Sequence, residues 1–183
     1  MKKYFFSGNT IFSTKCIDKK IDINQILLEF HDNKSEFNYS HFINRRWENI
    51  YLNPAKIPSV RPLLSYVISK ASQLYEQSFI VPHELLGFNK NEFWFNSAKK
   101  GESTRLHNHN TSAIISGVFY LQVPMKSGNL FFKNGNSYEL EITPETGKLV
   151  LFPSQLDHYV PDNKNKEKRI SISFNFYKFP LPR

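Results

Sequence analysis

Three histidines in this sequence have a spacing that suits a metal site. His107 and His109 stand two positions apart in RLHNHNTS, and His158 follows in FPSQLDHYVP. Two residues separated by one position on a strand point to the same face, as two ligands of one ion require. Imidazole nitrogen binds iron, zinc and copper alike. Taken alone, the pair also fits an Asn-rich loop without a metal, so the residues around it must decide.

Arg169 stands eleven positions after His158, beyond the segment YVPDNKNKEK. Its turn residues and charges are typical of a solvated connection. If this connection joins two antiparallel strands symmetrically, His158 and Arg169 come to lie opposite each other. Because arginine binds a carboxylate through two parallel hydrogen bonds, one small dicarboxylate would bridge a metal at His158 and the guanidinium of Arg169.

The segment RISISFNFY after this connection alternates strictly between polar and apolar residues. The polar set is Arg169, Ser171, Ser173 and Asn175, and the apolar set is Ile170, Ile172, Phe174 and Phe176. A strand turns successive side chains to opposite faces, so one face is polar and the other apolar. Either the polar face meets water, or it lines a pocket while the apolar face packs under helices.

Two kinds of pattern divide the chain and predict an α+β domain. From about residue 91, short apolar runs separated by Gly, Pro and Asn favour a barrel or two-sheet roll. We expect strands over residues 92–98, 112–123, 129–134, 137–143, 148–154, 158–160 and 169–179. The first 80 residues are interpreted as mostly helical, with helices over residues 22–33 and 59–78 and a weaker one over 40–51.

We therefore expect one domain over residues 1–183, with residues 1–90 as mostly helical support and residues 91–179 as the β-roll core. In the longest helix, Ser59 is the expected N-cap and Pro62 lies in the first turn, where its missing N–H does no harm. The helices would brace one face of the roll.

Composition limits the classes of partner. The net charge is +8, but the lysines are scattered rather than gathered on one stripe, which argues against nucleic acid and for a solvated surface. The single cysteine, Cys16, has no internal disulfide partner and suits an intracellular protein. The apolar run near the start ends at Ser7, too short for a secretory signal or a membrane span, so we expect a cytoplasmic location.

Residues 92–177 resemble the Fe(II)- and 2-oxoglutarate-dependent oxygenases, in particular small members of prolyl-hydroxylase-like type. The resemblance rests on HNH at 107–109, on His158 and on Arg169-x-Ser171, within SGVFYL, KLVLFPSQLDH and RISISFNF. It implies a double-stranded β-helix (a jelly roll, cupin-like) and an oxygenase that uses Fe(II), 2-oxoglutarate and dioxygen. Hydroxylation of a small molecule or peptide is the implied outcome, and nothing in the sequence identifies that substrate or the oligomeric state.

The resemblance also implies roles for individual residues. His107, His109 and His158 would hold the catalytic iron, and Arg169, helped by Ser171, would bind the distal carboxylate of 2-oxoglutarate. The family's usual second ligand is a carboxylate, whereas this chain has His109 there, flanked by Asn108 and Asn110. The site would then carry one negative charge fewer.

Other polar residues near these motifs have more than one interpretation. Asn96 and Tyr120 lie on flanking strands and are candidates for contact with the oxo acid, while Trp94 belongs to the core or to the pocket wall. Asp157 should point away from His158 on the opposite strand face. The remaining histidines, read as surface or packing residues, are His31, His41 and His83.

A cupin-like metal-binding protein, such as an isomerase, thiol dioxygenase or sugar-binding module, is the rival hypothesis. GKLVLFPSQLDH resembles the second cupin motif, with Gly147, Pro153 and His158 in register. Against this hypothesis, Gln155 stands where glycine is expected, and no glutamate follows the His-x-His pair in NTSAII. A cupin also has no need of Arg169.

Overall fold

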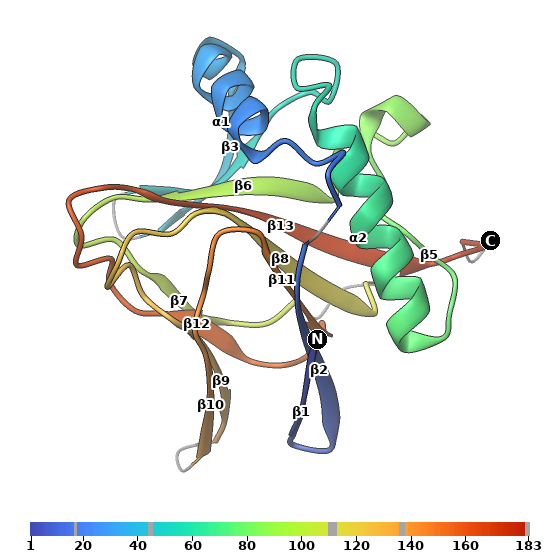
Figure 1. Cartoon of the computed structure of the whole chain (residues 1–183), viewed down its shortest axis with the longest axis vertical. Coiled ribbons are helices and arrows are strands. Elements are labelled where there is room, and N and C mark those ends of the chain that lie inside the picture. The colour runs from blue at the N-terminus through green and yellow to red at the C-terminus, as the bar shows by residue number, and fades with distance from the viewer. Residues whose placement is uncertain (17, 44–45, 110–112, 136–137, 182–183) are drawn as a thin grey trace.

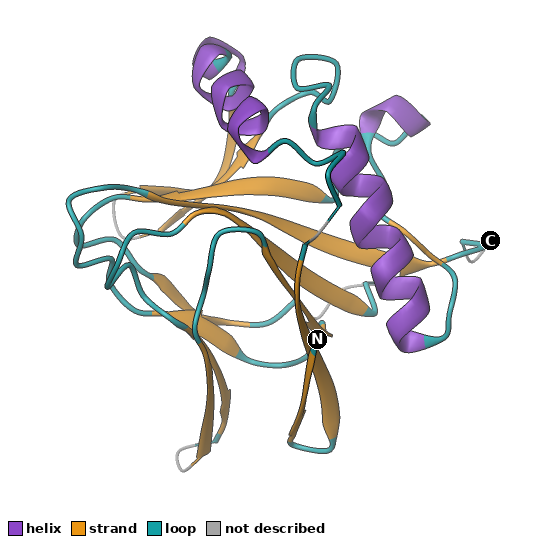
Figure 2. Cartoon of the chain, in the orientation of Figure 1, coloured by secondary structure: helices purple, strands orange, loops and turns teal. Residues whose placement is uncertain are grey.

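The computed structural model of the chain describes residues 1–16, 18–43, 46–109, 113–135 and 138–181. Asn110 and the first residues of the expected strands over 112–123 and 137–143 lie outside the described residues. Most of the regular structure is β-sheet, accompanied by two α-helices (Figure 2). This composition is consistent with the double-stranded β-helix fold.

The larger sheet has nine strands. Its hydrogen-bonded order is β1-β2-β11-β8-β13-β6-β4-β3, with β5 paired to β13. Its strands are β1 (Lys2–Phe6), β2 (Asn9–Lys15), β3 (Asn38–Ile43), β4 (Arg46–Tyr51), β5 (Phe79–Ile80), β6 (Phe93–Ala98), β8 (Ile115–Gln122), β11 (Lys148–Pro153) and β13 (Arg169–Lys178).

The smaller sheet has four strands in the order β10-β9-β12-β7. They are β7 (Thr104–His107), β9 (Leu130–Asn134), β10 (Tyr138–Ile142) and β12 (His158–Val160). A cluster of buried apolar side chains that includes Phe132 of β9 and Phe152 of β11 packs the two sheets together at one end. Some members of this cluster, Phe152 among them, also line the candidate site between the sheets.

The two helices, α1 (Ile23–Asp32) and α2 (Val60–Tyr75), cover the outer face of the larger sheet (Figure 1). Asp22 caps α1 by accepting the backbone N–H of Gln25 at 3.0 Å. The apolar stripe of α2 is buried as its spacing predicts and shares one core with the sheet. Burying such side chains is the main source of stability for an amphipathic helix of this length.

Ser59 has a role different from the expected helix cap. Its side chain makes no capping hydrogen bond to α2. Instead, its hydroxyl donates to Oε2 of Glu29 at 2.6 Å, and its backbone N–H donates to the same oxygen at 3.1 Å. Ser59 therefore ties the start of α2 to α1.

The expectation that residues 1–90 are mostly helical is wrong. Strands β1 and β2 occupy the first fifteen residues, and the weak helix expected over residues 40–51 is the β3–β4 hairpin. In β4, buried Arg46, Glu48 and Ile50 alternate with the more exposed Trp47, Asn49 and Tyr51, which is a period of two. The apolar residues of this segment also allow a helical pattern, and pairing of β4 with β6 decides in favour of a strand over a helix.

Strand β13 has its two faces in two different environments. Ile170, Ile172, Phe174 and Phe176 belong to the core under the helices. Its polar residues face a cavity between the sheets instead of open water. Of the two interpretations of the alternating pattern, the pocket is confirmed.

The chain offers no candidate for a membrane-spanning helix, as far as the described residues go.

Candidate active site

A cavity of about 790 Å³ lies between the two sheets. Its wall on the larger sheet carries the polar residues of β13, which are Arg169, Ser171, Ser173 and Asn175. The wall on the smaller sheet carries His107 and His158, and the β3–β4 hairpin contributes at one side. A volume of this size is typical of pockets that enclose small-molecule ligands.

His107, His109 and His158 meet in this cavity. Their ligand nitrogens all lie within 4.8 Å of one another. The ring centroids of His107 and His158 are 4.3 Å apart, and that of His109 is 5.1 Å and 5.3 Å from them, respectively. The three imidazoles therefore form a cluster that fits around one metal ion.

Strand pairing positions two of these histidines, and a loop contact positions the third. His107 ends β7 and lies directly opposite His158 of β12. The expectation that His109 shares a strand with His107 is wrong, because β7 ends at His107. The backbone N–H of His109 donates to the carbonyl of Ser154 at 2.8 Å, which holds the residue after the strand beside the pair.

Backbone carbonyls select the tautomer of two of the imidazoles. Nδ1 of His107 lies 2.8 Å from the carbonyl oxygen of Arg105, and Nδ1 of His158 lies 2.9 Å from that of Leu156. A carbonyl only accepts, so each Nδ1 carries the proton and each Nε2 keeps its lone pair for a ligand. A hydrogen bond from the other ring nitrogen to a backbone carbonyl is usual for metal-binding histidines.

Burial keeps His109 and His158 uncharged at neutral pH. Desolvation, together with the neighbouring His107, lowers the pKa of His158 well below its ordinary value and that of His109 to about 4. Neutral imidazole is the form that binds metal. The chemistry of the donor set therefore fits a divalent transition metal, Fe(II) included.

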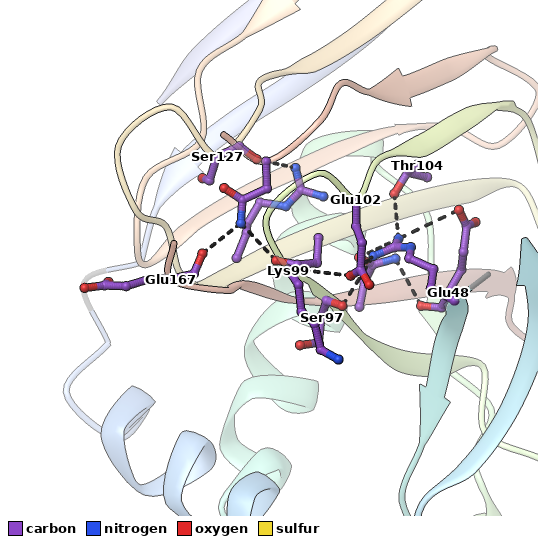
Figure 3. A network of polar contacts seen from close by, with 12 residues as sticks. Glu48, Ser97, Lys99, Glu102, Thr104, Ser127 and Glu167 are labelled. Carbon is purple, nitrogen blue, oxygen red and sulfur yellow. Dashed lines mark hydrogen bonds and ion pairs between the residues drawn. The ribbon is translucent and has the colours of Figure 1, made fainter. Parts of the chain in front are cut away.

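Arg169 is a buried cation, 2% exposed, at the same cavity. Its Nη1 donates to the carbonyl of Ser127 at 3.0 Å (Figure 3). It forms no ion pair with any carboxylate among the described residues. Burial lowers its pKa to about 10, so the guanidinium is still charged at neutral pH. A buried charge without a counter-ion is costly, and an anionic ligand would remove that cost.

Asn96, Ser171 and Tyr120 form a row across three neighbouring strands. Ser171 of β13 lies opposite Asn96 of β6 on one side and opposite Tyr120 of β8 on the other. Burial raises the pKa of Tyr120 to about 12, so its hydroxyl keeps its proton as a donor. The Asn96 amide is engaged elsewhere: its Oδ1 accepts from Nη2 of Arg46 at 3.3 Å and its Nδ2 donates to the carbonyl of Glu48 at 3.1 Å.

The symmetric connection predicted that His158 and Arg169 lie opposite each other in one sheet. This prediction is wrong. β12 pairs with β7 and β9, whereas β13 pairs with β5, β6 and β8. The connection between them crosses from the smaller sheet to the larger one. Both residues nevertheless line the same cavity, from opposite walls.

Several other expectations concern residues around the cluster. Trp94 belongs to the pocket wall, with its ring 5.7 Å from that of His109. Asp157 does not line the cavity and accepts a hydrogen bond from Asn108 at 2.8 Å. His41 is exposed, as expected for a surface residue, but it lies on strand β3 rather than in a helical segment, and it lines the cavity. His31 and His83 lie outside the cavity.

The hairpin residues of this site, above all Glu48, were not predicted from the sequence. Glu48 lines the cavity and is buried beside Arg46 (Figure 3). The period of two in β4 was the signal that could have found it, because a buried Arg and Glu at alternate positions of a strand indicate an internal polar site.

Comparisons with known proteins agree with this geometry. The family model described as "Putative 2OG-Fe(II) oxygenase" matches residues 92–141 and 132–175. No protein of curated function has a significantly similar sequence. Among solved structures, a prolyl-4-hydroxylase from Pseudomonas putida has a TM-score of 0.66 at 18% identity, with 92% of each chain covered.

Two further structures have the same fold. A prolyl hydroxylase from Trichoplax adhaerens, in complex with a hypoxia-inducible-factor peptide fragment, has a TM-score of 0.70 at 14% identity, covering 92% of this chain and 83% of that one. The α-ketoglutarate-dependent epimerase SnoN from nogalamycin biosynthesis has a TM-score of 0.70 at 13% identity, covering 92% and 77%. The family model spans residues 92–175, which include the strands that carry the site, and over this part the chain resembles the Fe(II)- and 2-oxoglutarate-dependent oxygenases, while the solved structures share its fold.

Proposed function

We propose that this protein is a dioxygenase that couples decarboxylation of 2-oxoglutarate to succinate with hydroxylation of a C–H bond in a second substrate. The family uses Fe(II), 2-oxoglutarate and dioxygen. The observation that carries the proposal for this chain is the pairing of a three-imidazole cluster with a buried arginine that lacks a carboxylate partner among the described residues, in one cavity.

His107, His109 and His158 are the proposed metal ligands. The two backbone-bonded imidazoles are held with Nε2 free, so little side-chain freedom is lost on binding. Bound Fe(II) would supply the activation of dioxygen, which no side chain of the chain can supply. With His109 in place of the usual carboxylate, the protein contributes no negative charge to the ion from these three ligands.

Arg169 is the proposed anchor for the distal carboxylate of 2-oxoglutarate. A guanidinium in a low-dielectric wall binds a carboxylate through two charge-assisted hydrogen bonds. Ser171 and Tyr120 stand beside it and offer hydroxyl donors to the same dicarboxylate. Asn96, whose amide already holds Arg46 and the carbonyl of Glu48, is assigned to positioning β4 against β6.

The cavity walls keep water away from the reacting atoms. Phe152 packs edge-on against His158 with a centroid distance of 4.8 Å, and Trp94 covers one side of His109. Excluding water strengthens the electrostatic interactions inside the site and protects reactive species from side reactions. In this proposal the helices α1 and α2 brace a jelly-roll core and take no part in the chemistry.

A cupin-like metal-binding protein is not favoured. Such a protein would use the histidine cluster but would have no use for Arg169, which is kept charged at a cost inside the wall. The second substrate is a small molecule or a peptide. The Trichoplax relative is recorded with a peptide, and SnoN acts in the biosynthesis of nogalamycin.

Anaerobic loading with Fe(II), followed by titration with 2-oxoglutarate, tests the proposal directly. A visible metal-to-ligand charge-transfer band should appear and saturate at one equivalent of 2-oxoglutarate. Succinate, which lacks the 2-oxo group, is the control and should give no band. Iron binding without any such band would contradict the proposed function.

A further inference from the structure

Glu48 is a buried carboxylate that the proposed chemistry does not use. It lines the cavity, and 8% of its side chain is exposed. Its Oε1 is shielded from solvent and accepts no hydrogen bond from the described residues. Nη2 of Arg46 lies 3.8 Å from this oxygen, which is too far for a hydrogen bond. A buried carboxylate oxygen that accepts no hydrogen bond favours a ligand that supplies a hydrogen-bond donor.

Arg46 has other partners and does not require Glu48. Its guanidinium donates to the carbonyl of Ser97, to Asn96 and to Thr104, each at 3.3 Å (Figure 3). A second carboxylate, that of Glu102, lies closer to it, at 3.5 Å. One guanidinium thus stands between two carboxylates. Only Glu48 of the two carboxylates lines the cavity.

Two aromatic side chains, Tyr51 and Trp94, line the same cavity. Their rings are 6.3 Å apart, and the ring of Trp94 is 5.7 Å from that of His109. Aromatic faces attract a cation through the ring quadrupole. The charged groups at the rim, Lys90 and Glu92, face each other at 3.8 Å and offset each other's charge.

We propose that Glu48 forms a subsite for a cationic nitrogen, an ammonium or a guanidinium, of a second substrate that also contacts the aromatic walls of the cavity. This inference rests on the proposed function for its catalytic meaning and names the substrate class of that site. The subsite lies on the hairpin side of the cavity. The second substrate would then reach the metal past His109.

Three probes test the subsite by calorimetric titration. N-acetyl-lysine amide is compared with N-acetyl-norleucine amide, which has the same carbon chain without the ammonium group. N-acetyl-arginine amide tests the guanidinium in the same way. The wild-type protein should bind the cationic probes at least about tenfold more tightly than the neutral one, equal to about 1.4 kcal/mol at 25 °C. The titrations are made in metal-free protein and again with Mn(II) and 2-oxoglutarate.

Glu48→Gln and Glu102→Gln are the matched variants, because both carboxylates contact Arg46 and only one lines the cavity. Glu48→Gln should abolish the preference for the cationic probes, whereas Glu102→Gln should retain it. Equal losses in both variants, or no preference in the wild type, would overturn the subsite. Circular dichroism of each variant shows that the fold is intact.

The outcome is separable from the proposed function. If 2-oxoglutarate binds in the presence of the metal and the cationic probes show no preference, the subsite alone is rejected. If the preference is present but 2-oxoglutarate does not bind, the oxygenase proposal is rejected and the cation subsite stands.

Discussion

Arg169 and His158 belong to different sheets and face one cavity from its two walls. β13 carries the cation in the larger sheet, and β12 carries the imidazole in the smaller one. A dicarboxylate held at Arg169 and at a metal on His158 would therefore span the space between the sheets. Ligand binding and the spacing of the sheets are coupled in this arrangement.

Removal of the guanidinium should separate anchoring of 2-oxoglutarate from metal binding. Arg169→Ala should leave metal affinity nearly unchanged. It should weaken the binding of 2-oxoglutarate by about 2–5 kcal/mol, because a charge pair in a partly buried pocket loses one partner. This equals a loss of affinity of roughly thirtyfold to several thousandfold. The affinity of Arg169→Lys for 2-oxoglutarate should lie between those of the wild type and Arg169→Ala, since lysine keeps the positive charge but not the two parallel N–H donors. Calorimetry with Mn(II) present measures all three.

Arg105→Ala is the control for this series, because Arg105 is an exposed cation at the rim of the same cavity. It should change 2-oxoglutarate affinity by less than Arg169→Lys does. Indifference of 2-oxoglutarate binding to Arg169→Ala would reject the oxygenase assignment.

Loss of either strand-paired histidine should empty the metal site. His107→Ala or His158→Ala leaves two imidazoles, and most bound iron should be lost. The fold should survive, because the main core lies on the other face of the larger sheet. Iron content after anaerobic loading and desalting measures the effect. His31→Ala, outside the cavity, should retain wild-type iron, and full iron in both site variants would refute the centre.

Substitution of His109 tests the unusual third ligand. His109→Asp restores a carboxylate at that position and should retain or improve affinity for Fe(II), whereas His109→Ala should weaken it. Competition with a chromogenic chelator under anaerobic conditions gives the three affinities. Identical values for the wild type and both variants would exclude His109 from the ligand set.

Gly128 should be essential for the placement of Arg169. Its φ is +95°, and a Cβ there would lie 2.5 Å from the carbonyl oxygen of Pro161 and 3.1 Å from Nη1 of Arg169. Gly128→Ala should therefore lower both stability and affinity for 2-oxoglutarate. Gly8→Ala, at φ +75° with no atom within 4 Å, is the control for backbone strain alone. It should cost about 1–2 kcal/mol of stability and leave 2-oxoglutarate affinity unchanged.

The metal-free protein should lose stability on acidification below about pH 6.5. The pKa of His109 is lowered to about 4 in the folded state, so between pH 6.5 and 4 the unfolded chain binds the proton and the folded chain does not. Stability therefore falls as the pH falls through this window, by about 2 kcal/mol at pH 5 from this residue. Thermal unfolding with a chelator present measures it, and His109→Asn should flatten the dependence. An unchanged slope in that variant would contradict the assigned shift.

Local patterns in the sequence predicted the second half of the chain well. All seven strands expected from residue 92 onward are present within a few residues of their expected ends among the described residues, because alternation and turn residues are local signals. The two faces of β13 were also predictable, since the direction of a strand side chain depends only on its position. The candidate residues His107, His158 and Arg169 were therefore recognised before their neighbours were known.

Tertiary structure decided which strands are neighbours. β2 pairs with β11, more than a hundred residues later, and β12 joins the sheet that lacks β13. No local pattern encodes such pairing, because it depends on which distant strand offers free hydrogen bonds and a matching apolar face. For the same reason, a segment that allowed a helix became the β3–β4 hairpin and brought Glu48 and His41 to the cavity. The type of chemistry could be predicted from residue types and spacing. The shape of the site, and the proposed position of Glu48 as a subsite for a cation, follow from packing between the sheets.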